Sequence, residues 1–167
     1  MIKRFLSTLC ALSIACSMLA VSLIEVKASE EKNIKVDGSY LTMAESSRGS
    51  TKDGIITRGE HLMDGECSIT KSGVGRIYVY SATTADHTVD YISAVLYVDR
   101  YNEETGKWGQ IYFEQVEDRA TYYVSTSKML MVDRGYYYRV RGAHVAGMTD
   151  EQPYDESTSF TDGIYIN

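Results

Sequence analysis

Polar and apolar residues alternate along much of the chain beyond residue 54, and this alternation predicts β-strands. The clearest case follows a polar turn at residues 133–135; because successive side chains of a strand point to opposite faces, its residues divide into two sets. The face expected to line a core holds Tyr136, Tyr138, Val140 and Gly142. The face expected to meet water holds Tyr137, Arg139, Arg141 and Ala143. The pattern is typical of a central strand in an antiparallel sheet with one wet face.

Residues 91–101 and 108–116 also alternate, and they predict a β-hairpin. The first segment has an apolar face of Ile92, Ala94, Leu96 and Val98, and the second places Ile111 and Phe113 on one side. The residues between them, 102–107, are polar and include Gly106, a composition that hairpin loops favour. We therefore expect the two segments to be neighbouring antiparallel strands.

Shorter alternating runs, separated by glycines or polar turns, predict the remaining strands. They cover residues 66–71, 75–82, 121–127 with a continuation at 128–132, and 159–166. Residues 83–90 and 147–157 are polar and are expected to be loops. No segment after residue 28 shows a helical period over about ten residues. About seven short strands with turns between them predict an all-β fold, an antiparallel β-sandwich.

Residues 1–28 have the pattern of a cleaved secretory signal peptide. Lys3 and Arg4 precede an apolar run from residue 5 to 24, and Val26 and Ala28 mark a cleavage site. The alternative is a retained membrane anchor, because a run of this length can span a bilayer. We expect cleavage, and hence an extracellular protein that keeps no membrane contact.

The next segment, residues 29–54, is rich in Ser, Glu, Lys and Gly and shows no sustained period. It is expected to be a flexible leader, with a short strand at residues 34–36 as the alternative. The folded domain then covers residues 55–167. Removal of 28 of the 167 residues leaves 139, enough for one domain with a core that needs no metal or disulfide.

The charge of the exported part argues against nucleic acid and anionic lipid as partners. The whole chain has 17 basic and 23 acidic residues, and the first 28 residues hold three of the basic and one of the acidic ones. The remainder has 14 basic and 22 acidic residues, a formal net charge of −8. Both kinds of partner favour a basic face, so we expect neither.

Cys67 is the one cysteine left after residue 28, and it cannot form an internal disulfide. It shares a face with Ile69 in a short alternating run, which predicts a buried apolar role. The alternatives are a reactive thiol and a link between copies of the chain. Catalysis by Cys67 with His61, His87 or His144 is not expected, because no local signature surrounds the cysteine.

The sequence predicts no cofactor and no metal site. None of the three histidines is spaced three or four residues from another ligand on a regular element, as a zinc site requires. The loop with Asp150, Glu151, Asp155 and Glu156 makes calcium an alternative to a solvated loop. It lacks the alternating acids and the glycine of a dedicated calcium loop.

The strand that contains Tyr138 resembles part of a fibronectin type III domain. In that family an apolar residue, a glycine and a tyrosine recur with the spacing of Val132, Gly135 and Tyr138. A hairpin like the one at residues 96–108 supplies its third and fourth strands. The resemblance implies an immunoglobulin/fibronectin III-like sandwich and covers about half of the domain. The chain departs from the family in the position of Trp108 and in having no proline-rich entry strand.

The whole chain is also similar to small secreted proteins of Gram-positive, clostridia-like bacteria, a family without an assigned function. The shared features are the signal peptide, the Gly-Tyr-Tyr-Tyr-Arg-Val strand followed by Gly142 and His144, and the ending at residues 161–164. This resemblance implies export and supplies no activity.

Tyrosine is the residue type that bears most on function, since all 14 tyrosines follow residue 28. A tyrosine offers a flat apolar face with a polar tip, which suits glycans, peptides and partner proteins. The alternative is ordinary sheet surface, because tyrosine favours strands. The candidate binding residues are Tyr97, Tyr101, Tyr122, Tyr137, Arg139 and Arg141.

We therefore predict a non-enzymatic binding or adhesion-type module with an exposed tyrosine and arginine face. Its expected partner is a glycan, a cell-wall component or an extracellular protein. The alternatives are a small secreted hydrolase with an unrecognised site and an assembling structural or accessory factor.

Overall fold

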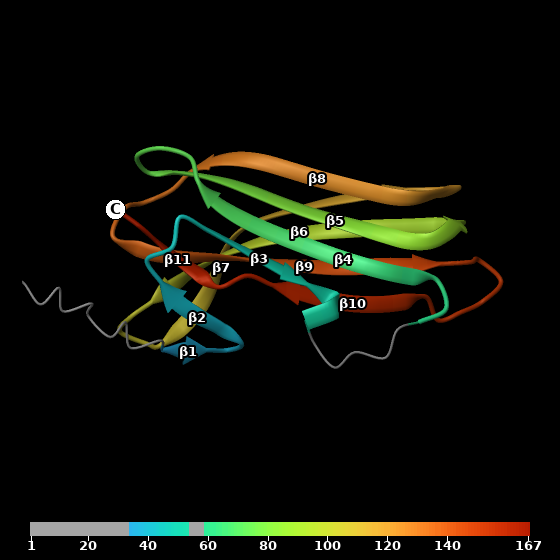
Figure 1. Ribbon diagram of the computed structural model, residues 1–167, viewed down its shortest axis with the longest axis horizontal. Coiled ribbons are helices and arrows are strands. Elements are labelled where there is room, and N and C mark those ends of the chain that lie inside the picture. Colours follow the sequence, from blue (N-terminus) through green and yellow to red (C-terminus); the bar gives the residue numbers. More distant parts are fainter. Residues whose placement is uncertain (1–33, 54–58) are drawn as a thin grey trace, which may run out of the picture. The chain divides into compact units, whose positions relative to one another are not determined.

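The computed structural model describes residues 34–53 and 59–167. Its strands are β1 (Lys35–Val36), β2 (Ser39–Thr42), β3 (Ser46–Ser50), β4 (Leu62–Lys71), β5 (Arg76–Val89), β6 (Tyr91–Asn102), β7 (Lys107–Asp118), β8 (Thr121–Met131), β9 (Tyr136–Gly147), β10 (Asp155–Phe160) and β11 (Gly163–Ile166). One sheet has the order β1-β2-β11-β9-β6-β7, with β10 also paired to β9, and the other has the order β3-β4-β5-β8. The predicted all-β antiparallel sandwich is confirmed (Figure 1). The described residues hold eleven strands, against the seven or so that we expected.

β9 is the central strand of its sheet, as the sequence predicted. It pairs along one edge with β6, where Leu96 lies opposite Gly142. Along the other edge it pairs first with β11, where Ile164 lies opposite Tyr138, and then with β10. β6 pairs in turn with β7, so the predicted hairpin is confirmed.

The inner faces of the two sheets form the hydrophobic core. Tyr138 and Leu96 are each 1% exposed, which confirms the predicted phase of both strands. The hydroxyl of Tyr138 donates to the Asp133 carbonyl at 2.7 Å, the bond that a corner tyrosine makes in many sandwiches. The larger cluster of buried residues contains Cys67, Ile69, Ile77, Val79, Leu96, Val98, Tyr138, Val140, Ile164 and Ile166.

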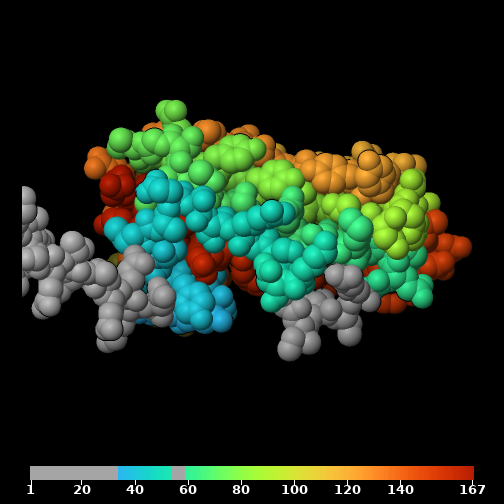
Figure 2. Space-filling model, viewed as in Figure 1, coloured from blue at the N-terminus to red at the C-terminus, as the bar shows by residue number. Residues whose placement is uncertain are grey.

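Residues 34–53 are not the flexible leader that the sequence predicted, because they supply β1, β2, β3 and a 3-10 turn at Thr51–Asp53. β1 and β2 form a hairpin whose two turn residues, Asp37 and Gly38, have φ angles of 49° and 86°. Positive φ at both positions is the reason that Asp-Gly favours such turns. β2 pairs in parallel with β11, and β3 pairs with β4. Figure 2 shows these early residues, blue to cyan, against the red carboxy-terminal strands.

Two predicted loops are partly strand. β5 continues to Val89, since Thr83, Ala85 and Val89 are buried, and β10 begins at Asp155. The single strand expected at residues 159–166 is divided into β10 and β11 at residues 161–162. Thr161 keeps this break attached to β9, because its N–H donates to the Val140 carbonyl at 3.0 Å and its Oγ1 accepts from the Val140 N–H at 2.9 Å.

The predicted signal peptide, residues 1–28, lies outside the described residues. Within 34–53 and 59–167, no helix has the length and apolarity needed to cross a bilayer.

His144 is part of the core and is fully buried. Its Nδ1 lies 3.0 Å from Thr83 Oγ1 and its Nε2 lies 2.8 Å from Ser159 Oγ. Two glycines make room for the ring: a Cβ on Gly65 would lie 2.2 Å from its Cγ, and a Cβ on Gly142 would lie 2.5 Å from its Nε2. Burial lowers the pKa of His144 to about 4. The side chain is therefore a neutral core residue.

The buried imidazole predicts a specific loss of stability in acid. As pH falls from 6.5 towards 4, the unfolded chain binds a proton on residue 144 that the folded chain does not bind. The free energy of unfolding should fall by about 3 kcal/mol over this window from this group alone. Urea unfolding at several pH values, compared with His144→Gln, isolates the contribution. The variant should show a shallower decline between pH 6.5 and 4, and parallel curves would contradict the prediction.

Candidate functional site

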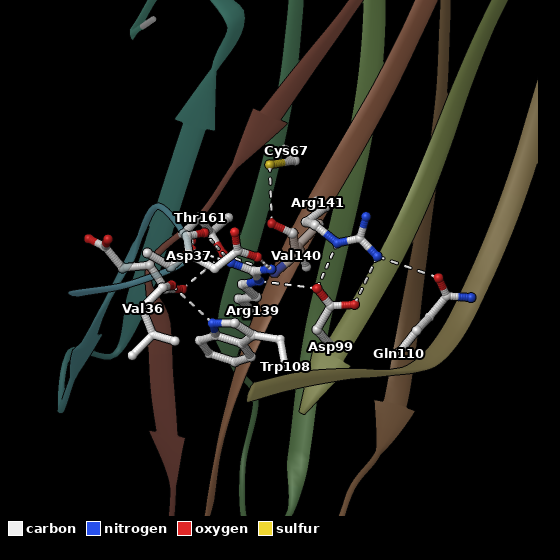
Figure 3. A network of polar contacts seen from close by, with 12 residues as sticks. Val36, Asp37, Cys67, Asp99, Trp108, Gln110, Arg139, Val140, Arg141 and Thr161 are labelled. Carbon is white, nitrogen blue, oxygen red and sulfur yellow. Dashed lines mark hydrogen bonds and ion pairs between the residues drawn. The ribbon is translucent and has the colours of Figure 1, made fainter. Parts of the chain in front are cut away.

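Arg139 lies on the outer face of β9, where the sequence predicted contact with water, yet only 2% of it is exposed. Its guanidinium donates from Nε to Asp99 Oδ2 (3.1 Å), from Nη1 to the Asp37 carbonyl (2.7 Å) and Ser39 Oγ (3.1 Å), and from Nη2 to Asp37 Oδ2 (2.9 Å). Its Cζ lies 4.5 Å from the ring centre of Trp108. The prediction of an exposed Arg139 is wrong, because the β1–β2 hairpin and Trp108 cover it (Figure 3).

Asp99, on β6, joins two arginines through one carboxylate. The side chain of Asp99 is 3% exposed, and its Oδ2 accepts from Nε of both Arg139 (3.1 Å) and Arg141 (2.6 Å). Its Oδ1 accepts a further bond from Arg141 Nη2 at 3.1 Å. The hydrogen bonds with Asp99 raise the pKa of Arg141 above its ordinary value. The pairing fixes the plane of the Arg141 guanidinium, whose side chain is 31% exposed.

A β-bulge in β7 brings Trp108 and Gln110 to the same face as Asp99. Val98 lies opposite Tyr112, but the next residue, Asp99, lies opposite Gln110, so Ile111 is the extra residue. Without the extra residue, Gln110 would share the inward side of Tyr112, which packs against the core. The bulge reverses the phase and turns Trp108 and Gln110 outward.

Trp108 is fixed from two sides. Its Nε1–H donates to the Val36 carbonyl at 3.1 Å, which joins β7 to the β1–β2 hairpin. The outer edge of its indole lies over Gly163 of β11, where an added Cβ would be 2.5 Å from the nearest ring carbon. The ring position therefore depends on the absence of a side chain at residue 163.

These side chains enclose a groove of about 580 Å³. Its lining comprises Val36, Asp37, Asp99, Gly106, Lys107, Trp108, Gln110, Arg139, Arg141 and Phe160. The lining holds three cationic and two anionic side chains, so it has a local excess of one positive charge in a chain of net charge −6. Aromatic surface and convergent hydrogen-bonding groups in one concave site are typical of ligand sites.

The structure brings five of the six predicted binding residues together and separates the sixth. The guanidinium of Arg141 lies 4.7 Å from the ring centre of Tyr97, and the rings of Tyr101 and Tyr137 are 6.5 Å apart. Tyr101 is only 9% exposed, so it belongs to the support of the groove. Tyr122 is 59% exposed, but it lies on β8 in the other sheet.

Sequence reasoning missed Asp37, Asp99, Trp108 and Gln110 as site residues. Folding the predicted hairpin about residues 103–106 would have placed Trp108 opposite Tyr101, as observed. The dipeptide Asp37-Gly38 is a strong hairpin signal that pointed to an ordered segment. The bulge at Ile111 gave no signal in the sequence.

Cys67 is buried, as predicted, and its thiol lies 3.7 Å from the Val140 carbonyl. Burial raises the pKa of Cys67 to about 11, which keeps the thiol protonated and poorly nucleophilic near neutral pH. A catalytic thiol and a link between copies both need access that Cys67 lacks.

The three histidines do not form one site. His144 is enclosed in the core, whereas His61 Nδ1 and His87 Nε2 lie 3.3 Å apart. The acidic loop lies beside this pair, with Glu151 Oε2 at 2.9 Å from His61 Nε2. The spacing of 26 and 90 residues between these partners explains why no local pattern indicated them.

Comparison with known proteins identifies a family whose function is unknown. A family model described as "Family of unknown function (DUF6147)" matches residues 27–161. No curated protein and no solved structure matches the chain.

Replacement of Arg139 should loosen the β1–β2 hairpin. Arg139→Met removes the donors that hold Asp37 and Ser39, and we expect a loss of about 3 kcal/mol in the free energy of unfolding. Arg141→Met is the matched control and should cost about 1 kcal/mol, since Asp99 keeps its bond to Arg139. Urea unfolding measures both losses, and hydrogen exchange at residues 35–42 locates the first. Equal losses in the two variants would show that Arg139 has no special role.

A side chain at residue 163 should displace Trp108. Gly163→Ala places a Cβ about 2.5 Å from the indole, so the ring must move out of the groove. Trp108 is the only tryptophan in the sequence, so its fluorescence reports this change directly. We expect a red-shifted emission and faster quenching by iodide. Gly109→Ala is the control for an alanine beside Trp108, because a Cβ there would lie 3.9 Å from its nearest neighbour, the Arg100 carbonyl oxygen. An unchanged emission spectrum would contradict the prediction, because it would mean that the Trp108 indole does not pack against residue 163.

Proposed function

The chain belongs to the DUF6147 family, whose function is unknown, and we propose that it is an exported, non-enzymatic module that binds a carboxylate-bearing glycan in the groove beside Trp108. The observation that carries the proposal is that two arginines pair with Asp99 but differ in exposure. Arg139 is buried and its donors hold the fold together, whereas Arg141 is held by Asp99 and is partly exposed at the groove. In Figure 3 one amino group of Arg141 is turned away from Asp99.

The side chains of the groove match the chemistry of a sugar acid. A sugar ring presents a flat C–H face and a ring of hydroxyl groups, and an aromatic side chain with planar polar groups complements both. Trp108 supplies the flat surface, while Gln110 and Arg141 supply an amide and a guanidinium 3.4 Å apart. The positive excess favours a carboxylate on the ligand, because arginine binds carboxylates through paired hydrogen bonds.

The same geometry favours binding over hydrolysis. A glycoside hydrolase needs two carboxyl groups, one of which carries a proton for the leaving group. In the groove both carboxylates, Asp37 and Asp99, accept hydrogen bonds from Arg139, so their oxygens are engaged in holding a guanidinium. The buried Cys67 offers no alternative nucleophile. The proposal therefore keeps the predicted binding role and moves it from an exposed tyrosine surface to the groove.

The experiment titrates the protein with oligosaccharides of a uronic acid and with neutral glucose oligosaccharides of the same length. We expect saturable binding of the acidic sugar, followed by the fluorescence of Trp108 and by calorimetry. The double variant Gln110→Ala with Arg141→Ala should weaken it at least about tenfold, the loss of about 1.4 kcal/mol. Tyr122→Ala, an exposed tyrosine on the other sheet, should leave the affinity unchanged.

Absence of binding to every acidic sugar would overturn the proposal. An equal loss in the Tyr122→Ala control would also overturn it, because the groove would then not be the site. If neutral sugars bound as tightly as acidic ones, Arg141 would not recognise a carboxylate, and that part of the proposal would be wrong.

A further inference from the structure

A second group of polar side chains lies away from the groove, where the chain enters β4. It contains His61 just before β4, His87 near the end of β5, and Glu151 in the loop that precedes β10. His61 is 8% exposed, and both of its ring nitrogens have partners. We propose that Glu60, His61 and Glu151 form a binding site for a divalent transition metal, with Zn²⁺ as the ion that fits best.

The distances suit a metal with three protein ligands. One ligand atom from each of Glu60, His61 and Glu151 lies within 4.8 Å of the other two. His61 Nε2 and Glu151 Oε2 are 2.9 Å apart. A tetrahedral zinc with bonds of about 2.0–2.1 Å places its ligand atoms about 3.3 Å from one another. Glu60 and Glu151 are exposed, so rotation of their side chains can bring the oxygens towards that geometry. Three protein ligands would leave a fourth position for water or a ligand.

The backbone at His61 is fixed independently of any metal. Asp155 Oδ2 accepts from the N–H of His61 at 2.6 Å and from the N–H of Leu62 at 3.0 Å. Gly59 passes so close that a Cβ there would lie 1.8 Å from the Asp155 carboxyl carbon. The backbone of the least exposed ligand is therefore held by a carboxylate that is not a ligand itself.

The hydrogen-bond chain behind His61 supports coordination through Nε2. His61 Nδ1 faces His87 Nε2 at 3.3 Å, and His87 Nδ1 contacts the Asp86 carboxylate. With a metal on His61 Nε2, His61 donates its Nδ1–H to His87, and His87 donates its own Nδ1–H to Asp86. Each of these contacts then has one donor and one acceptor. Carboxylate partners of this kind orient metal-binding histidines.

The ligand types select the class of metal. An imidazole nitrogen suits zinc, copper and nickel, whereas calcium and magnesium prefer oxygen alone. The acidic loop that suggested calcium in the sequence thus contributes one carboxylate to a mixed nitrogen and oxygen site.

The experiment measures Zn²⁺ and Ca²⁺ binding to the protein by calorimetry after treatment with a chelator. We expect one Zn²⁺ per chain and no measurable Ca²⁺ binding. Glu60→Gln with Glu151→Gln should weaken Zn²⁺ at least about 100-fold, and His87→Ala about 10-fold through the orientation of His61. Glu156→Gln, an exposed acid just after Asp155, is the matched control and should bind as the wild type does.

Both glutamate substitutions lie on exposed side chains, and the fluorescence of Trp108 checks that each variant is folded. No binding of Zn²⁺ by the wild type would overturn the inference, as would full affinity in the double variant. Calcium bound as tightly as zinc would overturn the choice of metal. None of these results depends on glycan binding, which is tested at different residues.

Discussion

The buried guanidinium of Arg139 is the interaction on which the outer face of the larger sheet depends. A buried charge is tolerated only when it is paired and its donors are satisfied. Arg139 meets this condition with Asp99 beneath it and with Asp37 and Ser39 beside it. The requirement draws the β1–β2 hairpin onto the sheet and gives Trp108 a surface to pack on. The groove therefore forms because the guanidinium of Arg139 needs hydrogen-bond partners and a cover.

The sandwich thus has two interiors of different character. Between the sheets, apolar side chains such as Leu96 and Val140 exclude water in the ordinary way. On the outer side of β9, the same strand buries a charge through hydrogen bonds and aromatic contacts. Directional contacts fix positions more narrowly than apolar packing, so the outer face suits a site that must hold its shape before a ligand arrives.

The sequence predicted what depends on local periodicity. The inward phase of Tyr138 and Leu96 follows from alternation alone, and so does the β6–β7 hairpin. The burial of Arg139 could not be predicted, because its cover comes from Asp37, 102 residues away. The outward turn of Trp108 depends on a bulge that alternation cannot reveal. The meeting of His61 with Glu151 arises from strand order, which a single sequence leaves open.

The parallel pairing of β2 with β11 joins the earliest described strands to the last one. Leu41 lies opposite Gly163, and Ser39 Oγ donates to the Thr161 carbonyl. A chain that emerges from the ribosome by its amino end therefore presents Val36 and Asp37 of the groove long before Arg139, Arg141 and Phe160 arrive. Completion waits for the final residues, since contacts of such long sequence separation form late. Such delayed closure makes the groove a property of the finished molecule alone.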